Sequence, residues 1–154
     1  MRPTLAIVES VDLGDLVRIQ ELRYRILRKP FGMPYASAQF PEDNLSATLH
    51  LMATSNQGIL GCASLLFDLS KSRTQLRGMA IAEEWQRHGI GTLLLERVHE
   101  IGVDRKQQLW CNARASAVAF YQRNGWTTCG DFFDVPLVGA HIVMEWHGMS
   151  SGKS

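Results

Sequence analysis

The sequence predicts a single α/β domain of the α+β kind, built around a mixed β-sheet. Runs with strand-like patterning gather on both sides of a central helical segment instead of alternating regularly with helices, which is typical of a mixed sheet. The chain of 154 residues contains no internal repeat and no linker, and its length fits one domain with a core of its own. We therefore expect residues 1–147 to form the domain and residues 148–154 to be a disordered tail.

The N-terminal part is predicted to form a strand, a helix and a long loop. Residues 4–9 have the pattern of a strand, and Asp12 and Asp15 can cap the helix that follows. Residues 31–46 are expected to form the loop, with a short helical turn around 42–45. The apolar face of the helix and the residues that end it are Leu16, Ile19, Leu22 and Ile26, then Pro30, Gly32 and Pro34. Its basic residues are expected to form a solvated face beside the loop: Arg23, Arg25, Arg28 and Lys29.

Six further strands are predicted. Side chains of residues 48–54 alternate between two faces, and a turn at residues 56–58 leads into a largely buried strand at 59–68. The remaining strands are expected at residues 74–81, 108–112, 126–135 and 140–146, and the last two form a hairpin around residues 136–139.

Two helices are expected among these strands. Apolar residues recur at helical spacing over residues 90–101, which predicts an amphipathic helix. Ser116 is expected to cap a second helix that runs through Tyr121, and the pair Asn124-Gly125 is a stop signal.

Composition argues against several classes of partner. Hydrophobic residues make up 45% of the chain and charged residues 20%, as in an ordinary globular protein. The 16 basic and 15 acidic residues give a net charge of +1, which argues against a nucleic-acid or membrane-binding surface. No apolar run approaches the roughly 20 residues of a membrane span, and the N-terminal segment lacks the apolar core of a secretion signal. We therefore expect a cytoplasmic protein.

The three cysteines are expected to be small core residues. Cys62, Cys111 and Cys129 do not have the spacing of metal ligands, so we predict no metal site. Cys111 lies near the candidate site described next, where a role as a nucleophile is the alternative.

The most informative motif is the glycine-containing turn at residues 86–91. Gly89 and Gly91 expose the backbone between a predicted strand and a predicted helix, where unpaired N–H groups and the positive end of the helix dipole attract phosphate oxygens. The alternative is that these glycines only permit tight packing. Two familiar phosphate motifs do not fit. Leu94 occupies the third glycine position of a dinucleotide fingerprint, and Thr92 stands where a P-loop needs lysine.

Three blocks of sequence together resemble the GNAT-type N-acetyltransferases, in a bacterial branch that acts on small acceptors. The blocks are residues 22–32, residues 76–91 with Gln-x-x-Gly-x-Gly at the end, and residues 112–126 with Asn-Ala-Arg-Ala at the start and Phe-Tyr before Gly-Trp. This resemblance spans nearly the whole chain. It implies a mostly antiparallel sheet of about seven strands flanked by about four helices, with splayed central strands. It also implies acetyl-CoA as the co-substrate.

The resemblance implies roles for residues along an acetyl-CoA site. The strand backbone at Met79, Ala80 and Ile81 would hydrogen-bond the pantetheine arm, and Asn112 would bind the same arm. Tyr121 would stand beside the thioester sulfur and protonate the leaving thiolate. N–H groups of the glycine turn would cradle the diphosphate, and the cofactor-binding residues there are Gln86, Arg87, His88, Gly89, Ile90, Gly91 and Thr92.

The base that accepts the amine proton is the least defined part of this site. The strand at 74–81 carries neither a carboxylate nor a histidine, and Arg77 cannot accept a proton at neutral pH. His141, on the last predicted strand, is our choice of base. Asp68, Glu145 and a chain of water molecules are the alternatives.

We therefore expect an N-acetyltransferase that moves an acetyl group directly from acetyl-CoA to a primary amine of a small molecule or peptide. Direct transfer needs no enzyme nucleophile, which disfavours Cys111. The acceptor pocket is expected between residues 31–46, residues 136–139 and Tyr121. Two alternatives stay open: a non-catalytic acyl-CoA sensor or scaffold, and an interaction domain whose glycine turn is structural. We expect neither nucleic acid nor membrane as a partner, and a homodimer is compatible with the resemblance.

Overall fold

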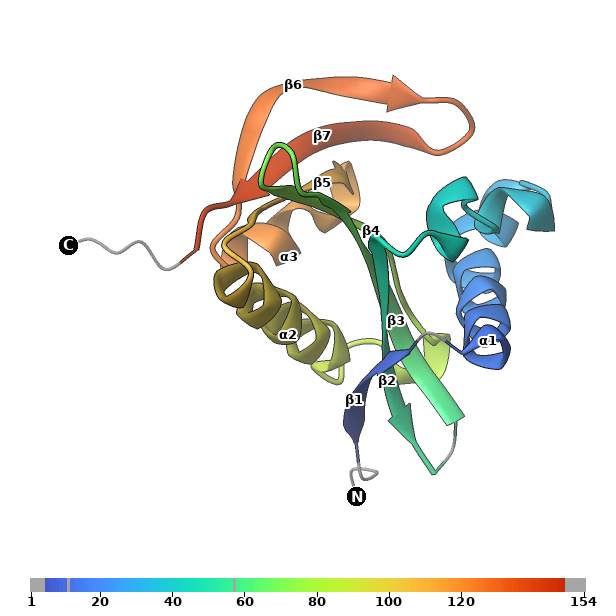
Figure 1. Ribbon diagram of the computed structural model, residues 1–154. Helices are drawn as coiled ribbons and strands as arrows, with labels where there is room; N and C mark the ends of the chain where they lie inside the picture. Colours follow the sequence, from blue (N-terminus) through green and yellow to red (C-terminus); the bar gives the residue numbers. More distant parts are fainter. Residues whose placement is uncertain (1–4, 11, 57, 149–154) are drawn as a thin grey trace.

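The predicted strands form one continuous sheet (Figure 1). The computed structural model describes residues 5–10, 12–56 and 58–148, and its strands follow the order β1-β2-β3-β4-β5-β7-β6. Neighbouring strands are antiparallel except β4 and β5, which are parallel. The strands are β1 (Ala6–Ser10), β2 (Thr48–Ser55), β3 (Gly58–Asp68), β4 (Arg73–Ile81), β5 (Gln108–Arg114), β6 (Thr127–Val135) and β7 (Gly139–Trp146). The mixed, mostly antiparallel sheet is therefore confirmed.

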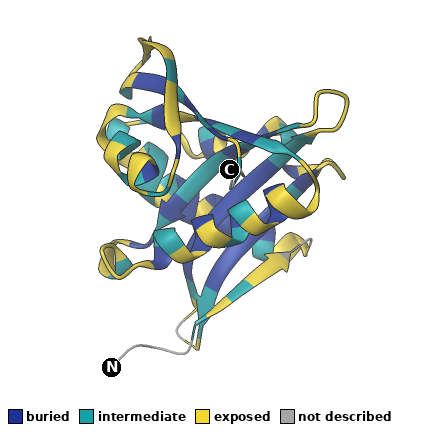
Figure 2. Ribbon diagram, turned by 90° about the vertical axis from the view of Figure 1, so that its left-hand side faces the viewer, coloured by how far each residue is buried: buried dark blue, intermediate teal, exposed yellow. Residues whose placement is uncertain are grey.

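Helices cover both faces of this sheet, and each face has its own core. α1 (Leu13–Arg23) lies on one face, whereas α2 (Ile90–Asp104) and α3 (Val118–Arg123) lie on the other (Figure 1). The apolar side of α2 packs against the sheet, and Figure 2 shows buried residues gathered in the central strands with exposed residues on the outer helix surfaces. The smaller core, under α1, consists of Ile19, Leu22, Met52, Cys62, Ala80 and Ala82.

The two central strands separate along their length. β4 and β5 pair over residues 73–75 and 108–110, and no further pairing joins them among the described residues. Beside this opening β4 carries a bulge, at which Gly78 and Met79 together face Ala63 of β3. Gly78 has a φ of 63°, a conformation that glycine adopts readily. The splayed centre expected from the resemblance is thus present.

The first helix begins as predicted. Asp12 caps α1 because its carboxylate accepts hydrogen bonds from the N–H groups of Gly14, at 2.6 Å, and Asp15, at 3.3 Å. After α1 the chain continues as a π-helical turn, Tyr24–Arg28, before the helical path ends near Gly32 as expected. Gly32 adopts the left-handed conformation that commonly ends helices, with a φ of 71°.

The predicted loop at residues 31–46 contains more structure than expected. It holds the 3-10 turns Tyr35–Ala38 and Pro41–Asn44, and a third, Lys29–Phe31, leads into it. The turn Pro41–Asn44 lies where the short helical turn was expected. The structure therefore has three α-helices with short 3-10 turns beside them in its described part, close to the expected count of about four helices.

The prediction for the start of α3 is wrong. Ser116 lies inside the 3-10 turn Ala115–Ala117, and the N-cap of α3 is Ala117, which makes no side-chain capping bond. α3 also continues past Tyr121 to Arg123. A 3-10 turn leading directly into the helix leaves Ser116 too early in the chain to cap it.

Some sequence predictions fall outside the described residues. They concern Thr4 of the first strand, Gln57 of the first hairpin turn and residues 149–154 of the expected tail. Among the helices that the structure describes, none is both long and apolar enough to cross a membrane.

Candidate functional site

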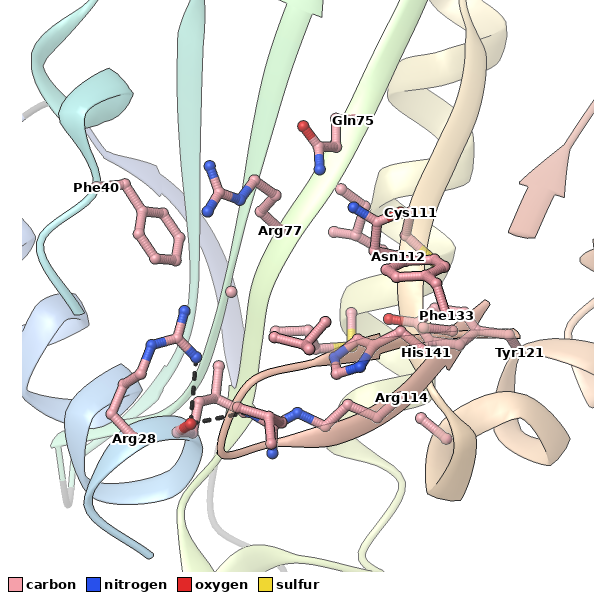
Figure 3. Close-up of a pocket in the computed structure, with 18 of the residues that line it drawn as sticks. Arg28, Phe40, Gln75, Arg77, Cys111, Asn112, Arg114, Tyr121, Phe133 and His141 are labelled. Atoms are coloured by element: carbon pink, nitrogen blue, oxygen red, sulfur yellow. Dashed lines mark hydrogen bonds between the residues drawn. The ribbon is translucent and has the colours of Figure 1, made fainter. Parts of the chain in front are cut away.

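The opening between β4 and β5 forms a cavity of about 350 Å³ (Figure 3). β4 and β5 line two of its sides, and the segment after α1 and the β6–β7 hairpin complete it. Met33 and Phe40 from the loop, Val138 from the hairpin turn and Tyr121 all line this cavity, so the three segments expected around an acceptor pocket do meet. The predicted site residues that line it are Met79, Asn112, Tyr121 and His141.

Tyr121 reaches the cavity from α3 and is almost fully buried, with 8% of its surface exposed. Burial raises the pKa of its phenol well above the ordinary value, and the neighbouring Cys111 raises it further. Its ring packs against Trp126 and Phe120, with ring centroids 5.1 Å and 5.2 Å away. The hydroxyl is therefore a fixed, protonated donor at any ordinary pH.

Cys111 lies on β5 and shares a hydrogen bond with the Tyr121 hydroxyl. Burial raises the pKa of its thiol to about 12, although that hydrogen bond acts in the opposite direction. The thiolate, which is the nucleophilic form, is therefore scarce near neutral pH. This environment fits the prediction that Cys111 is a core residue.

His141 projects from β7 into the cavity, and the hydrogen bond it makes fixes the tautomer of its neutral ring (Figure 3). Its Nδ1 lies 2.8 Å from the carbonyl oxygen of Gly139, and because a carbonyl only accepts, Nδ1 carries the proton. Nε2 then holds the lone pair and has no hydrogen-bond partner in the described part of the chain. The two weaker candidates for the base, Asp68 and Glu145, do not line the cavity.

The glycine turn stands outside the cavity lining, between the end of β4 and the start of α2 (Figure 1). Gly89 is the N-cap of α2, with a φ of 82°, and no side chain caps the helix. Arg87 also has a positive φ, of 65°. Gln86 closes the turn by donating from Nε2 to the carbonyl oxygen of Ile81 at 3.1 Å. The first N–H groups of α2 are thus left without side-chain partners.

The two glycines of this turn have different surroundings. A Cβ added to Gly89 would meet no atom within 4 Å, so the space beside it is open. A Cβ added to Gly91 would lie 3.4 Å from the ring of Phe120, so Gly91 packs against α3. Of the other predicted cofactor residues, Ala80 and Ile90 are buried in the core, and His88 sits edge-on to Trp85.

Three arginines in the cavity were not predicted as site residues. Arg28, Arg77 and Arg114 line it from the π-helical turn, β4 and β5. Strand alternation could have predicted one of them. Arg114 lies two residues after Asn112 and therefore on the same face of β5. Arg28 had been expected on a solvated helix face, and that expectation is wrong for it.

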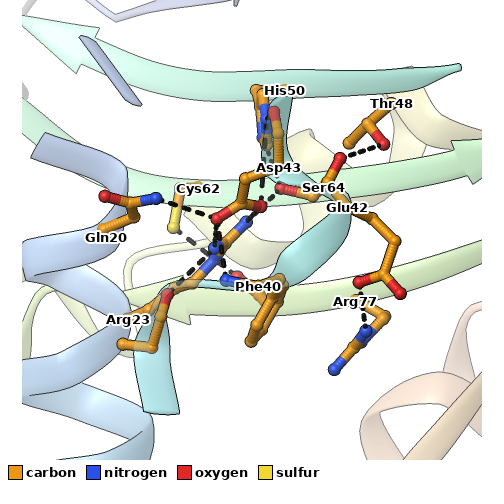
Figure 4. Close-up of polar contacts among 12 residues, drawn as sticks. Gln20, Arg23, Phe40, Glu42, Asp43, Thr48, His50, Cys62, Ser64 and Arg77 are labelled. Atoms are coloured by element: carbon orange, nitrogen blue, oxygen red, sulfur yellow. Dashed lines mark hydrogen bonds and ion pairs between the residues drawn. The ribbon is translucent and has the colours of Figure 1, made fainter. Parts of the chain in front are cut away.

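Arg23 was also expected on the solvated helix face, and that expectation is wrong because Arg23 is fully buried beneath the loop at residues 31–46. Arg25 and Lys29 are exposed, as expected. The guanidinium of Arg23 forms two hydrogen bonds with the carboxylate of Asp43, at 2.7 Å and 2.9 Å (Figure 4). It also donates to the Ser64 hydroxyl at 2.7 Å, and its Cζ atom lies 3.9 Å from the centre of the Phe40 ring. This ion pair joins α1 to the loop that supplies one wall of the cavity.

The chain is similar to known acetyltransferases in sequence and fold. Residues 46–128 match the family model described as the acetyltransferase (GNAT) domain. The uncharacterized N-acetyltransferase YitI of Bacillus subtilis (strain 168) is 33% identical over 148 residues, which cover 89% of this chain and 93% of YitI.

Solved structures show the same fold. An acyl-CoA N-acyltransferase from Pseudomonas aeruginosa superimposes with a TM-score of 0.82 and 20% identity, covering 93% of this chain and 99% of that one. An aminoglycoside 6'-N-acetyltransferase in complex with coenzyme A superimposes with a TM-score of 0.71 and 15% identity, covering 91% of this chain and 95% of that one.

Proposed function

The chain belongs to the GNAT acetyltransferase family, and we propose that it transfers an acetyl group directly from acetyl-CoA to a primary amine. One observation carries this proposal for the chain itself. A protonated phenol, Tyr121, and an imidazole with an available lone pair, His141, line one cavity where the central strands separate. We propose them as the acid and the base of acyl transfer between sulfur and nitrogen.

The start of α2 supports the choice of donor. Its first N–H groups lack side-chain caps and stand beside open space at Gly89, and the helix dipole adds partial positive charge there. We propose that residues 87–92 bind the diphosphate of acetyl-CoA. The backbone of β4 from Met79 to Ile81, with Asn112 on β5, would then guide the pantetheine arm toward Tyr121.

The proposed reaction needs two proton transfers. The amine nitrogen attacks the thioester carbonyl carbon, so that a C–N bond forms, and His141 Nε2 accepts the proton that the nitrogen loses. Breaking of the C–S bond releases a thiolate, which takes a proton from the Tyr121 hydroxyl. A backbone N–H at the β4 bulge, near Met79, would stabilise negative charge on the carbonyl oxygen. Solvent then carries the proton from His141 back to Tyr121.

The raised pKa of Tyr121 is compatible with its role as acid. An exposed thiol, with a pKa of about 8.5, would be a poor base toward a phenol. Burial, however, raises the pKa of the adjacent Cys111 thiol to about 12. A leaving thiolate held in the same environment would become more basic for the same reason, so burial raises the pKa values of the acid and of its acceptor together.

Thiol release from acetyl-CoA with a panel of primary amines tests this function. We expect release with at least one amine, and Tyr121→Phe should lower kcat by about 10²- to 10⁴-fold while leaving the affinity for CoA nearly unchanged. Tyr35→Phe, the same chemical change outside the cavity, serves as the control and should retain activity. Tight CoA binding without thiol release for any amine would contradict the proposal and favour a non-catalytic sensor.

A further inference from the structure

The cavity carries an unusual excess of positive charge for an enzyme that acts on amines. Its lining includes Arg28, Arg77 and Arg114, together with His141, and contains no Asp or Glu among the described residues. Burial lowers the pKa of the Arg28 guanidinium, and repulsion from Arg114 and Arg77 lowers it further. An acceptor that enters as a simple ammonium ion would meet this repulsion with no carboxylate in the lining to offset it.

The three arginines differ in how they are neutralised. Arg77 forms an ion pair with Glu42, with 3.3 Å between Nη1 and Oε1. Its Cζ atom also lies 4.1 Å from the centre of the Phe40 ring. Neither Arg28 nor Arg114 forms an ion pair within the described part of the chain. Each is half-buried, where an uncompensated charge is costly.

Arg28 and Arg114 instead converge on one backbone oxygen (Figure 3). The carbonyl of Leu27 accepts from Arg28 Nη1 at 3.1 Å and from Arg114 Nη2 at 2.8 Å. Arg28 Nε also donates to the carbonyl of Ser37 at 3.2 Å. Each guanidinium has five N–H donors, so both keep donors for a ligand, and these hydrogen bonds fix the two groups in position.

We propose that the acceptor is a small amino-carboxylate, whose carboxylate binds to Arg28 and Arg114 while its amine faces His141. This inference rests on the proposed function and adds the class of acceptor to it. Guanidinium groups match the planar geometry of a carboxylate and compensate its charge. The cavity of about 350 Å³ would also hold the thioester end of the donor, so the space that is left favours an acceptor as small as a free amino acid.

A panel of free L-amino acids, each compared with its amide, tests this inference. The amide keeps the amine and the side chain and lacks the negative charge. We expect kcat/KM for the best amino acid to exceed that for its amide by about ten- to a hundred-fold. Amides acetylated as well as the free acids would overturn the inference while leaving the transferase function intact.

Variants assign this preference to the two arginines. Arg28→Gln and Arg114→Gln should each raise KM for the amino acid about tenfold or more and remove most of the preference over the amide. Arg28→Lys, which keeps the charge and most of the length, should recover part of it. Arg105→Gln, outside the cavity lining, is the control. If the Gln variants weaken CoA binding instead, the arginines hold the donor and the inference fails.

A binding experiment separates this inference from the catalytic proposal. N-acetyl amino acids, the expected products, are titrated by calorimetry into CoA-saturated wild-type protein and into the Gln variants, with N-acetyl amino-acid amides as the comparison. Binding of the acids alone, lost in correctly folded variants, would support the carboxylate site even if no thiol is released. Equal binding of acids and amides, or no binding of either, would overturn it.

Discussion

At the scale of single residues, the hydrogen bond made by His141 decides what its ring can do. The carbonyl of Gly139 holds the proton on Nδ1, which leaves Nε2 as the acceptor inside the cavity. The sequence indicated His141 only through its place on the last strand. The contact with Gly139 depends on the tight turn between β6 and β7, and no local pattern encodes the direction of the ring.

His141→Ala should lower kcat/KM by about 10²- to 10⁴-fold at neutral pH, because a general base contributes about that much. If the ring accepts the proton that the amine loses, the pH–rate profiles of the wild type and the variant should differ. His147→Ala, on an exposed residue, is the control. A variant that retains the wild-type pH profile would assign proton removal to water or another group.

At the scale of elements, a buried polar network joins α1 to the loop that walls the cavity (Figure 4). Burial by itself would raise the pKa of the Asp43 carboxyl group. Hydrogen bonds from Arg23 and Gln20, together with the positive charge of Arg23, outweigh this effect, so the pKa lies below its usual range. The His50 ring extends the network by bonding to the Ser64 hydroxyl at 2.7 Å and to the Asp43 carbonyl at 2.9 Å.

Asp43→Asn should reduce the free energy of unfolding by about 3–5 kcal/mol at neutral pH, because it leaves the Arg23 charge buried without its counter-ion. A carboxylate with a lowered folded pKa stabilises the protein above its unfolded pKa of about 3.9, and this contribution is lost as pH falls through the folded pKa. The difference between wild type and variant should therefore shrink on acidification. Denaturant titrations at stepped pH measure it.

Glu83→Gln provides the matched control for this experiment. Glu83 pairs with Arg25 on the surface, at 3.3 Å, and both side chains are largely exposed. Losing this pair should cost at most about 1 kcal/mol. If Asp43→Asn has an effect as small as that of the control, the buried network does not hold the loop.

The start of α2 offers a second test at this scale. Gly89→Val should weaken CoA binding at least tenfold, because a side chain would fill the open space where the diphosphate is proposed to lie. Gly130→Val is the matched control. Gly89 and Gly130 both have positive φ values, 82° and 77°, and open space beside them, so the backbone strain is comparable. Equal CoA affinity in the two variants would contradict the proposed cradle.

At the scale of the whole molecule, the sequence predicts the elements better than it predicts which of them meet. Alternation and capping residues locate the strands, α1 and α2, because those signals are local. Ser116 shows the limit of these local signals. Serine is a good capping residue, but Ser116 lies inside a 3-10 turn and α3 starts after it. The burial of Arg23 depends on Asp43, 20 residues further along the chain, and no periodicity reveals that partner.

The candidate site shows the same limit. The glycine turn and Tyr121 are identifiable from sequence blocks, and their roles remain predictions. Arg28 and Arg114 meet at a single carbonyl because a π-helical turn and the end of β5 converge in space. The basic residues along the helix predicted that Arg28 is in solvent. The acceptor side of the cavity could therefore not be predicted from local patterns, because it depends on how the elements pack together.

Direct acetyl transfer is the central claim, and following the acetyl group tests it most directly. The protein is incubated with isotope-labelled acetyl-CoA and the best amine of the panel, and the masses of amine and protein are measured through a single turnover. We expect the label on the amine nitrogen, with none bound to the protein at any time. Label retained on acetyl-CoA despite CoA binding, or label trapped on the Cys111 thiol, would contradict the account.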